Sequence, residues 1–527
     1  MLKLTIRWCI KAIPRFPCAV LALTLAAFLA SHATSAAGSS NRLLLYTVTF
    51  HAMQSDGISV ELTYYDEPRD QYVFYSVPSW LENPLYPTTR DPLMEISVRD
   101  IGGNDLPVTF EPNVNGTQLF RFQKGDGGPY QIFYALDFSG FDPEDIDAGP
   151  LPHLTDTDGF LYGNYLFVYP AIRGTLAEDF RTRDYEIRVF FRNGDNVRLL
   201  GVPPKVNPTT PYELIFFQFY LGDVQVYQGL AAGIFYDLAF HHHLPTAEEF
   251  DYFHNNLPSQ IAAVVNYFRS PCVPRVFLTI SADNSYSGME ATNGFSMEFL
   301  DGMVNFSDLY NPLTQVIGEI IHHEMIHLWI GIRLGELNDP WFKEGLTTYL
   351  GLLLALKSGF VTEEYFRNSM VNDQSGNPVI EHVALSDPQI RIRLFDDMLW
   401  SSMVYIKGAQ VAFLLDLAIR DATGNEKTLQ DALLHLWSRF APGAFNREEF
   451  LKGIAKSTGF DARRFFHRFI DAPGAVSVQE LDEAMQKAQQ YGVFRLTSRR
   501  IETKRPGFHP PWMMKEAMRH RLLWLQN

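Results

Sequence analysis

The segment His323-Glu324-Met325-Ile326-His327 lies inside an apolar stretch, and Trp341-Phe342-Lys343-Glu344-Gly345 follows it closely. On a helix, two histidines four residues apart share one face, where both imidazoles can reach one metal ion. Glu344, on the next predicted helix, adds a carboxylate. A set of two nitrogens and one carboxylate suits zinc and leaves a fourth position open for water. The two segments therefore predict one open zinc site per chain, formed by His323, His327 and Glu344.

The residues around the motif strengthen this prediction over the alternative of an ordinary helix that happens to carry two histidines. The helix is apolar on most sides through Ile320, Ile321, Met325, Ile326, Leu328 and Trp329. Burying imidazoles and carboxylates in such a helix is costly unless they are hydrogen-bonded or bind a metal. Glu324 points beside the ligands, so we expect it to accept a proton from water and pass it to the leaving amine.

The spacing of other polar residues near the motif is compatible with more than one role. Glu319 lies one helical turn before His323, and we expect it either to orient that imidazole or to lie at the surface. His322 is displaced around the helix and is expected beside the site or exposed. The run 241–243 contains three histidines without spaced partners, so we predict a loop or helix edge there.

Length and composition describe a folded protein of several domains. The chain has 527 residues, of which 46% are hydrophobic and 20% charged, and this length favours two to four domains. The formal net charge is −16. A chain this acidic is not expected to bind nucleic acid through a general basic surface.

The first 37 residues have the pattern of a signal peptide. Lys3, Arg7, Lys11 and Arg15 precede an apolar run over 19–30, and small residues follow. The run is short for a stable membrane span, so we predict export to the periplasm or the medium, with no span in the mature chain. An uncleaved signal that anchors the protein in the membrane is the alternative. Loss of the four basic residues would change the net charge from −16 to −20.

Hydrophobic patterns divide the remainder into regions. Residues 40–226 alternate in polarity or run β-branched and aromatic between Gly, Pro, Asn and Asp, which predicts a β-sandwich-like domain. A catalytic domain is predicted over 227–358 and an α-helical domain over 359–495. A basic tail with several prolines occupies 496–527. Helices are predicted over 246–268, 312–334, 340–357, 362–371, 405–420, 428–439, 447–456, 462–470 and 478–491.

Four segments in order resemble the gluzincin aminopeptidases, which include the aminopeptidase N and glycyl aminopeptidase families. They are 287–290 (Ser-Gly-Met-Glu), 323–329, 338–345 and 405–409 (Tyr-Ile-Lys-Gly-Ala). The resemblance covers roughly 277–470 and is closer to the glycyl aminopeptidases. It implies a multidomain α+β fold with a thermolysin-like α/β zinc peptidase core between the β-sandwich-like and helical domains.

The resemblance also implies a role for each matched residue. Glu290, with Gly288 beside it, would bind the free α-amino group of a peptide. Tyr405 would donate a hydrogen bond to the tetrahedral oxyanion. The chemistry fits these roles, because a carboxylate pairs well with an ammonium and a preorganised phenol stabilises developing negative charge. We therefore expect an exported zinc metallopeptidase that removes N-terminal residues from peptides or proteins.

Two alternatives follow from the same residues. Ala291 stands where the aminopeptidase N motif has asparagine, which leaves an endopeptidase on the same core as one alternative. The other is a peptide-binding relative without catalytic activity, although the presence of Glu324 and Tyr405 argues against it. The sequence does not determine the oligomeric state.

Overall fold

The computed structural model describes most of the chain between residues 42 and 494. The described ranges are 42–51, 56–76, 93–111, 119–139, 153–154, 158–172, 179, 184–194, 197–200, 202, 205–222, 224–241, 244–283, 287–300, 304–336, 339–393 and 398–494. The predicted signal peptide and the basic tail lie outside these residues.

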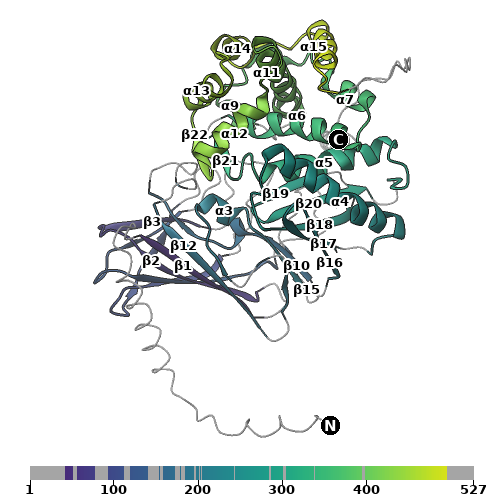
Figure 1. Cartoon of the computed structure of the whole chain (residues 1–527). Helices are drawn as coiled ribbons and strands as arrows, with labels where there is room; N and C mark the ends of the chain where they lie inside the picture. Colours follow the sequence, from purple (N-terminus) through teal and green to yellow (C-terminus); the bar gives the residue numbers. More distant parts are fainter. Residues whose placement is uncertain are drawn as a thin grey trace, which may run out of the picture.

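A seven-stranded sheet forms one layer of the N-terminal region (Figure 1). Its order is β14 (Lys205–Val206), β12 (Glu186–Asn193), β1 (Leu43–Phe50), β2 (Ile58–Tyr65), β8 (Tyr130–Leu136), β4 (Leu93–Arg99) and β5 (Asp105–Leu106). Strand β1 runs parallel to β12 and antiparallel to β2. Buried and partly exposed residues alternate along β1 and β2, because successive side chains of a strand point to opposite faces.

Two four-stranded sheets contribute to the same hydrophobic core. One has the order β13 (Leu199–Leu200), β15 (Gln218–Gly222), β10 (Asp158–Tyr162), β9 (His153–Leu154), and the other β11 (Tyr169–Pro170), β3 (Gln71–Tyr75), β7 (Leu119–Gln123), β6 (Val108–Phe110). Aromatic contacts join the sheets: ring centroids lie 5.0 Å apart for Tyr64 and Phe74, and 5.3 Å apart for Phe191 and Phe219. The short helices η2 (Gly163–Tyr165) and α3 (Pro211–Ile215) connect strands here. Sheets therefore pack face to face in this region.

A mixed five-stranded sheet follows. Its order is β16 (Val226–Ala231), β17 (Ile234–His241), β18 (Arg275–Asp283), β20 (Gly294–Leu300) and β19 (Ser287–Ala291). The three central strands are parallel, and β16 and β19 are antiparallel at the two edges. Helix α4 (Ala247–Phe268) links β17 to β18 and begins with a capping box between Thr246 and Glu249. The sequence carrying Gly288 and Glu290 thus forms an edge strand.

The two motif helices are α5 (Pro312–His327) and α6 (Pro340–Ser358). The prediction that the first helix continues to Leu334 is wrong. The chain turns at Gly331, whose φ of +98° does not fit a right-handed helix. It then forms β21 (Leu334–Glu336), which pairs with β22 (Gly443–Phe445). The earlier end places His327 in the last turn of α5.

Helices make up most of the described chain after α6. They are α7 (Glu363–Met370), α8 (Pro378–His382), α9 (Gln389–Arg393), α10 (Met398–Ser402), α11 (Gly408–Ala422), α12 (Leu429–Phe440), α13 (Arg447–Thr458), α14 (Arg463–Phe469) and α15 (Val478–Gln490). A π-helical turn, η3 (Met403–Lys407), joins α10 to α11. One hydrophobic cluster runs from Ala231 to Phe494, so the five-stranded sheet and the helices share a core. The fold is mixed α+β with several domains (Figure 1).

The continuous helical segment Met398–Ala422 is long and apolar enough to span a membrane. However, 89% of its most apolar window is buried inside the protein. Its composition is accounted for by its position in the core.

Candidate metal centre

Helices α5 and α6 bring the three predicted ligands together. His323 Nε2 and His327 Nε2 lie 2.9 Å apart, and Glu344 Oε2 lies 3.5 Å from the first and 3.4 Å from the second. Ligands about 2.0–2.1 Å from a tetrahedral zinc ion are separated by about 3.3 Å. The two imidazole–carboxylate distances match this separation, and the two imidazole nitrogens lie about 0.4 Å closer together than it, so a small adjustment of the rings lets one zinc ion bind all three donors.

Hydrogen bonds orient both imidazoles toward this point. His327 Nδ1 lies 3.2 Å from the carbonyl oxygen of Ile330, to which it can only donate. The hydroxyl of Thr348 donates to the carbonyl oxygen of Glu344, so its oxygen is left to accept from His323 Nδ1 at 3.4 Å. Each ring then keeps its proton on Nδ1 and turns the Nε2 lone pair toward the other ring. Two lone pairs facing each other at this distance favour a cation between them.

The electrostatics of the three ligands also favour a cation. Burial lowers the pKa of His327, but the carboxylates of Glu344 and Glu290 outweigh it and raise this pKa to about 9. Burial raises the pKa of Glu344, yet Lys343 and His327 hold it well below its ordinary value. The cluster therefore attracts positive charge, and a divalent ion satisfies that demand more fully than a proton.

Glu324 lies beside the ligands without being one of them. Its side chain is buried, and Oε2 has no hydrogen-bond partner within the described part of the chain. Burial raises its pKa to about 8, against the opposing effect of His327. A buried carboxylate with one unsatisfied oxygen and a raised pKa is suited to take up a proton.

Gly288 gives Glu324 the space it occupies. A Cβ atom at Gly288 would lie 2.4 Å from Oε1, 2.6 Å from Cγ and 2.7 Å from Cδ of Glu324. No side chain fits at position 288 unless that carboxylate moves. The edge strand β19 thus packs its backbone directly against the proposed general base.

Glu290, two residues further along β19, belongs to the same cluster. Ligand atoms of Glu290, Glu324 and His327 all lie within 4.8 Å of one another. The ammonium group of Lys343 contacts Glu290 Oε1 and lies 3.1 Å from Glu344 Oε1. The role of Lys343 was not predictable from the sequence, because its partner Glu290 is 53 residues away in the chain.

Tyr405 approaches the ligands from the π-helical turn η3. Its ring centroid lies 6.3 Å from that of His323. Burial, together with the carboxylates of Glu344, Glu290 and Glu324, holds the pKa of Tyr405 well above its ordinary value. The phenol therefore keeps its proton and can donate a hydrogen bond. Single π-helical turns within α-helices occur frequently at functional sites.

The other polar residues considered from the sequence lie outside this group. Glu319 is buried and accepts a 2.6 Å hydrogen bond from Tyr365, so a surface position is wrong. His322 is also buried, with Nδ1 on the carbonyl oxygen of Gly318 and Nε2 3.1 Å from Ser358 Oγ. These two residues tie α5 to neighbouring helices. His241 ends strand β17, whereas residues 242 and 243 are not described.

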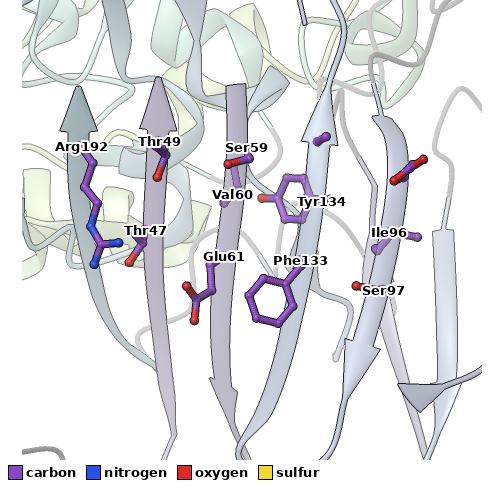
Figure 2. A pocket seen from close by; sticks show the side chains of 12 residues that line it. Thr47, Thr49, Ser59, Val60, Glu61, Ile96, Ser97, Phe133, Tyr134 and Arg192 are labelled. Atoms are coloured by element: carbon purple, nitrogen blue, oxygen red, sulfur yellow. The ribbon is translucent and has the colours of Figure 1, made fainter. Parts of the chain in front are cut away.

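A groove of about 530 Å³ lies on the seven-stranded sheet (Figure 2). Side chains from β12, β1, β2, β8 and β4 line it, among them Arg192, Thr47, Glu61, Phe133 and Ser97. None of its lining residues belongs to the clusters that could hold a metal. Among the described residues, the groups of side chains that could hold a metal come from α5, α6 and β19.

Comparison with known proteins supports this location. Residues 252–469 match the peptidase family M1 domain, and this range contains every residue of the cluster described above. The comparison with curated protein sequences finds no match.

Solved structures of related fold agree with the family match. An aminopeptidase N family protein from Idiomarina loihiensis superposes with a TM-score of 0.62 at 16% identity, covering 84% of this chain and 78% of that one. A mutant M1 zinc metallopeptidase from Deinococcus radiodurans superposes with a TM-score of 0.52 at 12% identity, covering 84% of this chain and 96% of that one. The same mutant metallopeptidase bound to a Tyr-Ser-Ala substrate superposes with a TM-score of 0.53 at 13% identity, covering 84% of this chain and 95% of that one.

At identities of 12–16%, the similarity to these structures shows a shared fold. The family match adds a sequence relationship over residues 252–469. The resemblance to gluzincin aminopeptidases is thereby confirmed. Over residues 252–469, this chain carries a peptidase family M1 domain.

Proposed function

We propose that this protein is an exported zinc aminopeptidase that removes N-terminal residues from peptides, with one zinc ion per chain. One observation carries the proposal. Three zinc-ligand donors, a buried carboxylate with an unsatisfied oxygen and a second carboxylate on an edge strand lie in one cluster. The second carboxylate, Glu290, distinguishes an aminopeptidase from a general metallopeptidase.

His323, His327 and Glu344 would hold the zinc ion. When bound, zinc lowers the pKa of water and polarises a carbonyl group. Glu324 would accept the proton of the attacking water and return it to the leaving amine, and its carboxylate lies in one cluster with the carboxylate of Glu290 and the imidazole of the ligand His327. Tyr405 donates its proton in a hydrogen bond to the oxyanion, because its raised pKa keeps the phenol protonated.

Glu290 would fix the position of the scissile bond. Its carboxylate would accept the α-ammonium of the peptide within a few ångströms of the proton acceptor Glu324, since their ligand atoms lie within 4.8 Å. Only the first peptide bond of a chain anchored there can reach the general base. Strand β19 is at the edge of its sheet among the described strands, so an extended peptide can pair with its backbone.

A panel of fluorogenic aminoacyl substrates, with and without a chelator, tests the proposal. We expect release of the fluorophore that stops on chelation and returns with added zinc. Glu290→Ala separates the two kinds of peptidase: an aminopeptidase loses activity on free-amine peptides. Cleavage of internal bonds by the wild-type protein, unaffected by Glu290→Ala, would instead establish an endopeptidase.

Export is part of the proposal and rests on the sequence alone. The basic residues Lys3, Arg7, Lys11 and Arg15 and the apolar run after them support it. N-terminal sequencing of the protein after expression in a bacterial host tests it. A mature chain beginning close to residue 38 is expected, and an intact leader on a cytoplasmic protein would refute it.

A further inference from the structure

The carboxylate proposed to bind the substrate's amine already has an ammonium partner in the structure. Lys343 Nζ contacts Glu290 Oε1, where the α-ammonium of a peptide would bind. The contact is confined, since the side chains of Glu290 and Lys343 are only 11% and 27% exposed. An ion pair shielded in this way is weakened less by salt than a surface pair.

The stem of Lys343 is held so that its ammonium reaches this position. Gly331 has a φ of +98°, and a Cβ atom there would lie 2.9 Å from Lys343 Cγ. The lysine stem therefore passes over a turn that only glycine accommodates. The placement of Nζ is determined by packing and not by the charge of Glu290 alone.

Glu290 is already paired before a substrate arrives. Three carboxylates gather here, from Glu290, Glu324 and Glu344, and the ammonium group in contact with Glu290 is that of Lys343. A peptide ammonium that enters the site must therefore take over a carboxylate that is already paired.

Lys343 has other partners to which it can shift when Glu290 is taken. Its Nζ lies 3.1 Å from Glu344 Oε1 and 5.7 Å from the centroid of the Phe216 ring. A carboxylate and an aromatic face both stabilise an ammonium group. When a peptide ammonium displaces Lys343 from Glu290, both ammonium groups therefore still have a partner. The two can exchange on Glu290 without leaving a charge unpaired.

We propose that Lys343 competes with the α-ammonium of the substrate for Glu290 and thereby sets the affinity of the site for free-amine peptides. This inference rests on the proposed function, since it assigns Glu290 to the substrate amine. Lys343 acts as a specificity-determining residue. Its removal should make the site more selective for a free amine.

The test measures binding without turnover. Glu324→Gln removes the general base, and the zinc-loaded variant is titrated calorimetrically with leucyl-leucine and with N-acetyl-leucyl-leucine. Adding Lys343→Met should tighten binding of leucyl-leucine about tenfold, as expected for removal of one competing ion pair. Binding of the acetylated peptide should not change, because it brings no ammonium.

Two further variants control for charge. Lys487→Met removes the same positive charge from an exposed pair with Asp421 on other helices and should not tighten binding. Adding Glu290→Gln to the Lys343→Met protein should abolish the gain. Zinc content is measured for each variant, so that altered metal loading is not read as altered peptide affinity.

Unchanged or weaker affinity for leucyl-leucine in the Lys343→Met protein, including no binding by either protein, would overturn the inference. Tighter binding of both peptides would also overturn it, because the effect would then not concern the amine. The proposed function fails separately, if the wild-type protein releases no N-terminal residue from any substrate in the panel.

Discussion

Gly288→Ala is a one-methyl change whose effect can be worked from the structure. The added Cβ would lie 2.4 Å from Glu324 Oε1, whereas ordinary contacts begin at 3.4 Å. The carboxylate must therefore move by about 1 Å, the difference between these distances. A displacement of this size at a catalytic group costs about 100-fold in rate, or about 2.7 kcal/mol in the activation free energy.

The stability of the Gly288→Ala protein should change little. The atoms that must move belong to the end of one side chain, so we expect the free energy of unfolding to change by less than about 1 kcal/mol. Zinc content should stay the same, because Glu324 is not a ligand in the proposed site. The effect should appear in kcat, measured with a fluorogenic aminoacyl substrate, beside thermal melting and metal analysis.

Gly453→Ala is the matched control. A Cβ atom there would lie 2.7 Å from Leu436 Cδ2, so the atom that must move again belongs to the end of one side chain, but on α12 and not at the metal ligands. We expect kcat within about threefold of wild type, since the base is not displaced. If Gly288→Ala also stays within threefold, the carboxylate of Glu324 does not act from its observed position, and the assigned role is wrong.

Three further variants have defined outcomes. Glu324→Gln should retain zinc but lose at least about 100-fold in kcat, and near-normal turnover would reject Glu324 as the base. Glu319→Gln should stabilise the fold at pH 8 by about 3 kcal/mol. Burial raises the pKa of Glu319 to about 7, so its destabilising ionisation develops as the pH rises from about 4.5 to 7. Denaturant unfolding should show the gain disappear near pH 4. Lys407→Met should stabilise by a similar amount at pH 7, because burial lowers the pKa of Lys407 to about 8 and Nζ has no hydrogen-bond partner in the described chain. That gain should shrink as the pH rises from 8 to 10.5, and a pH-independent difference would contradict the ionisation argument.

The convergence of the three candidate metal ligands was predictable because its information is local. The spacing of His323 and His327 determines a shared helix face, and Glu344 follows one short connection later. The apolar residues around them indicate burial whatever the details of the fold. The helical periodicity of the apolar residues likewise predicted the positions of most described helices after residue 340.

Features that depend on distant contacts were not predictable. Lys343 on α6 pairs with Glu290 on β19, 53 residues away in the chain, and Glu319 accepts a hydrogen bond from Tyr365 on α7. The end of α5 depends on a left-handed Gly331, whereas the prediction relied on the more distant Gly335. The π-helical turn that carries Tyr405 has no signature in hydrophobic periodicity.

Metal analysis of the purified protein and its ligand variants tests the central claim most directly. Wild type is predicted to hold about one zinc ion per chain, with three protein ligands and one open position. His323→Ala, His327→Ala and Glu344→Ala should each lose most of it, whereas Glu324→Gln should keep it. A wild-type protein that takes up no zinc, or ligand variants that all remain fully loaded, would contradict the account.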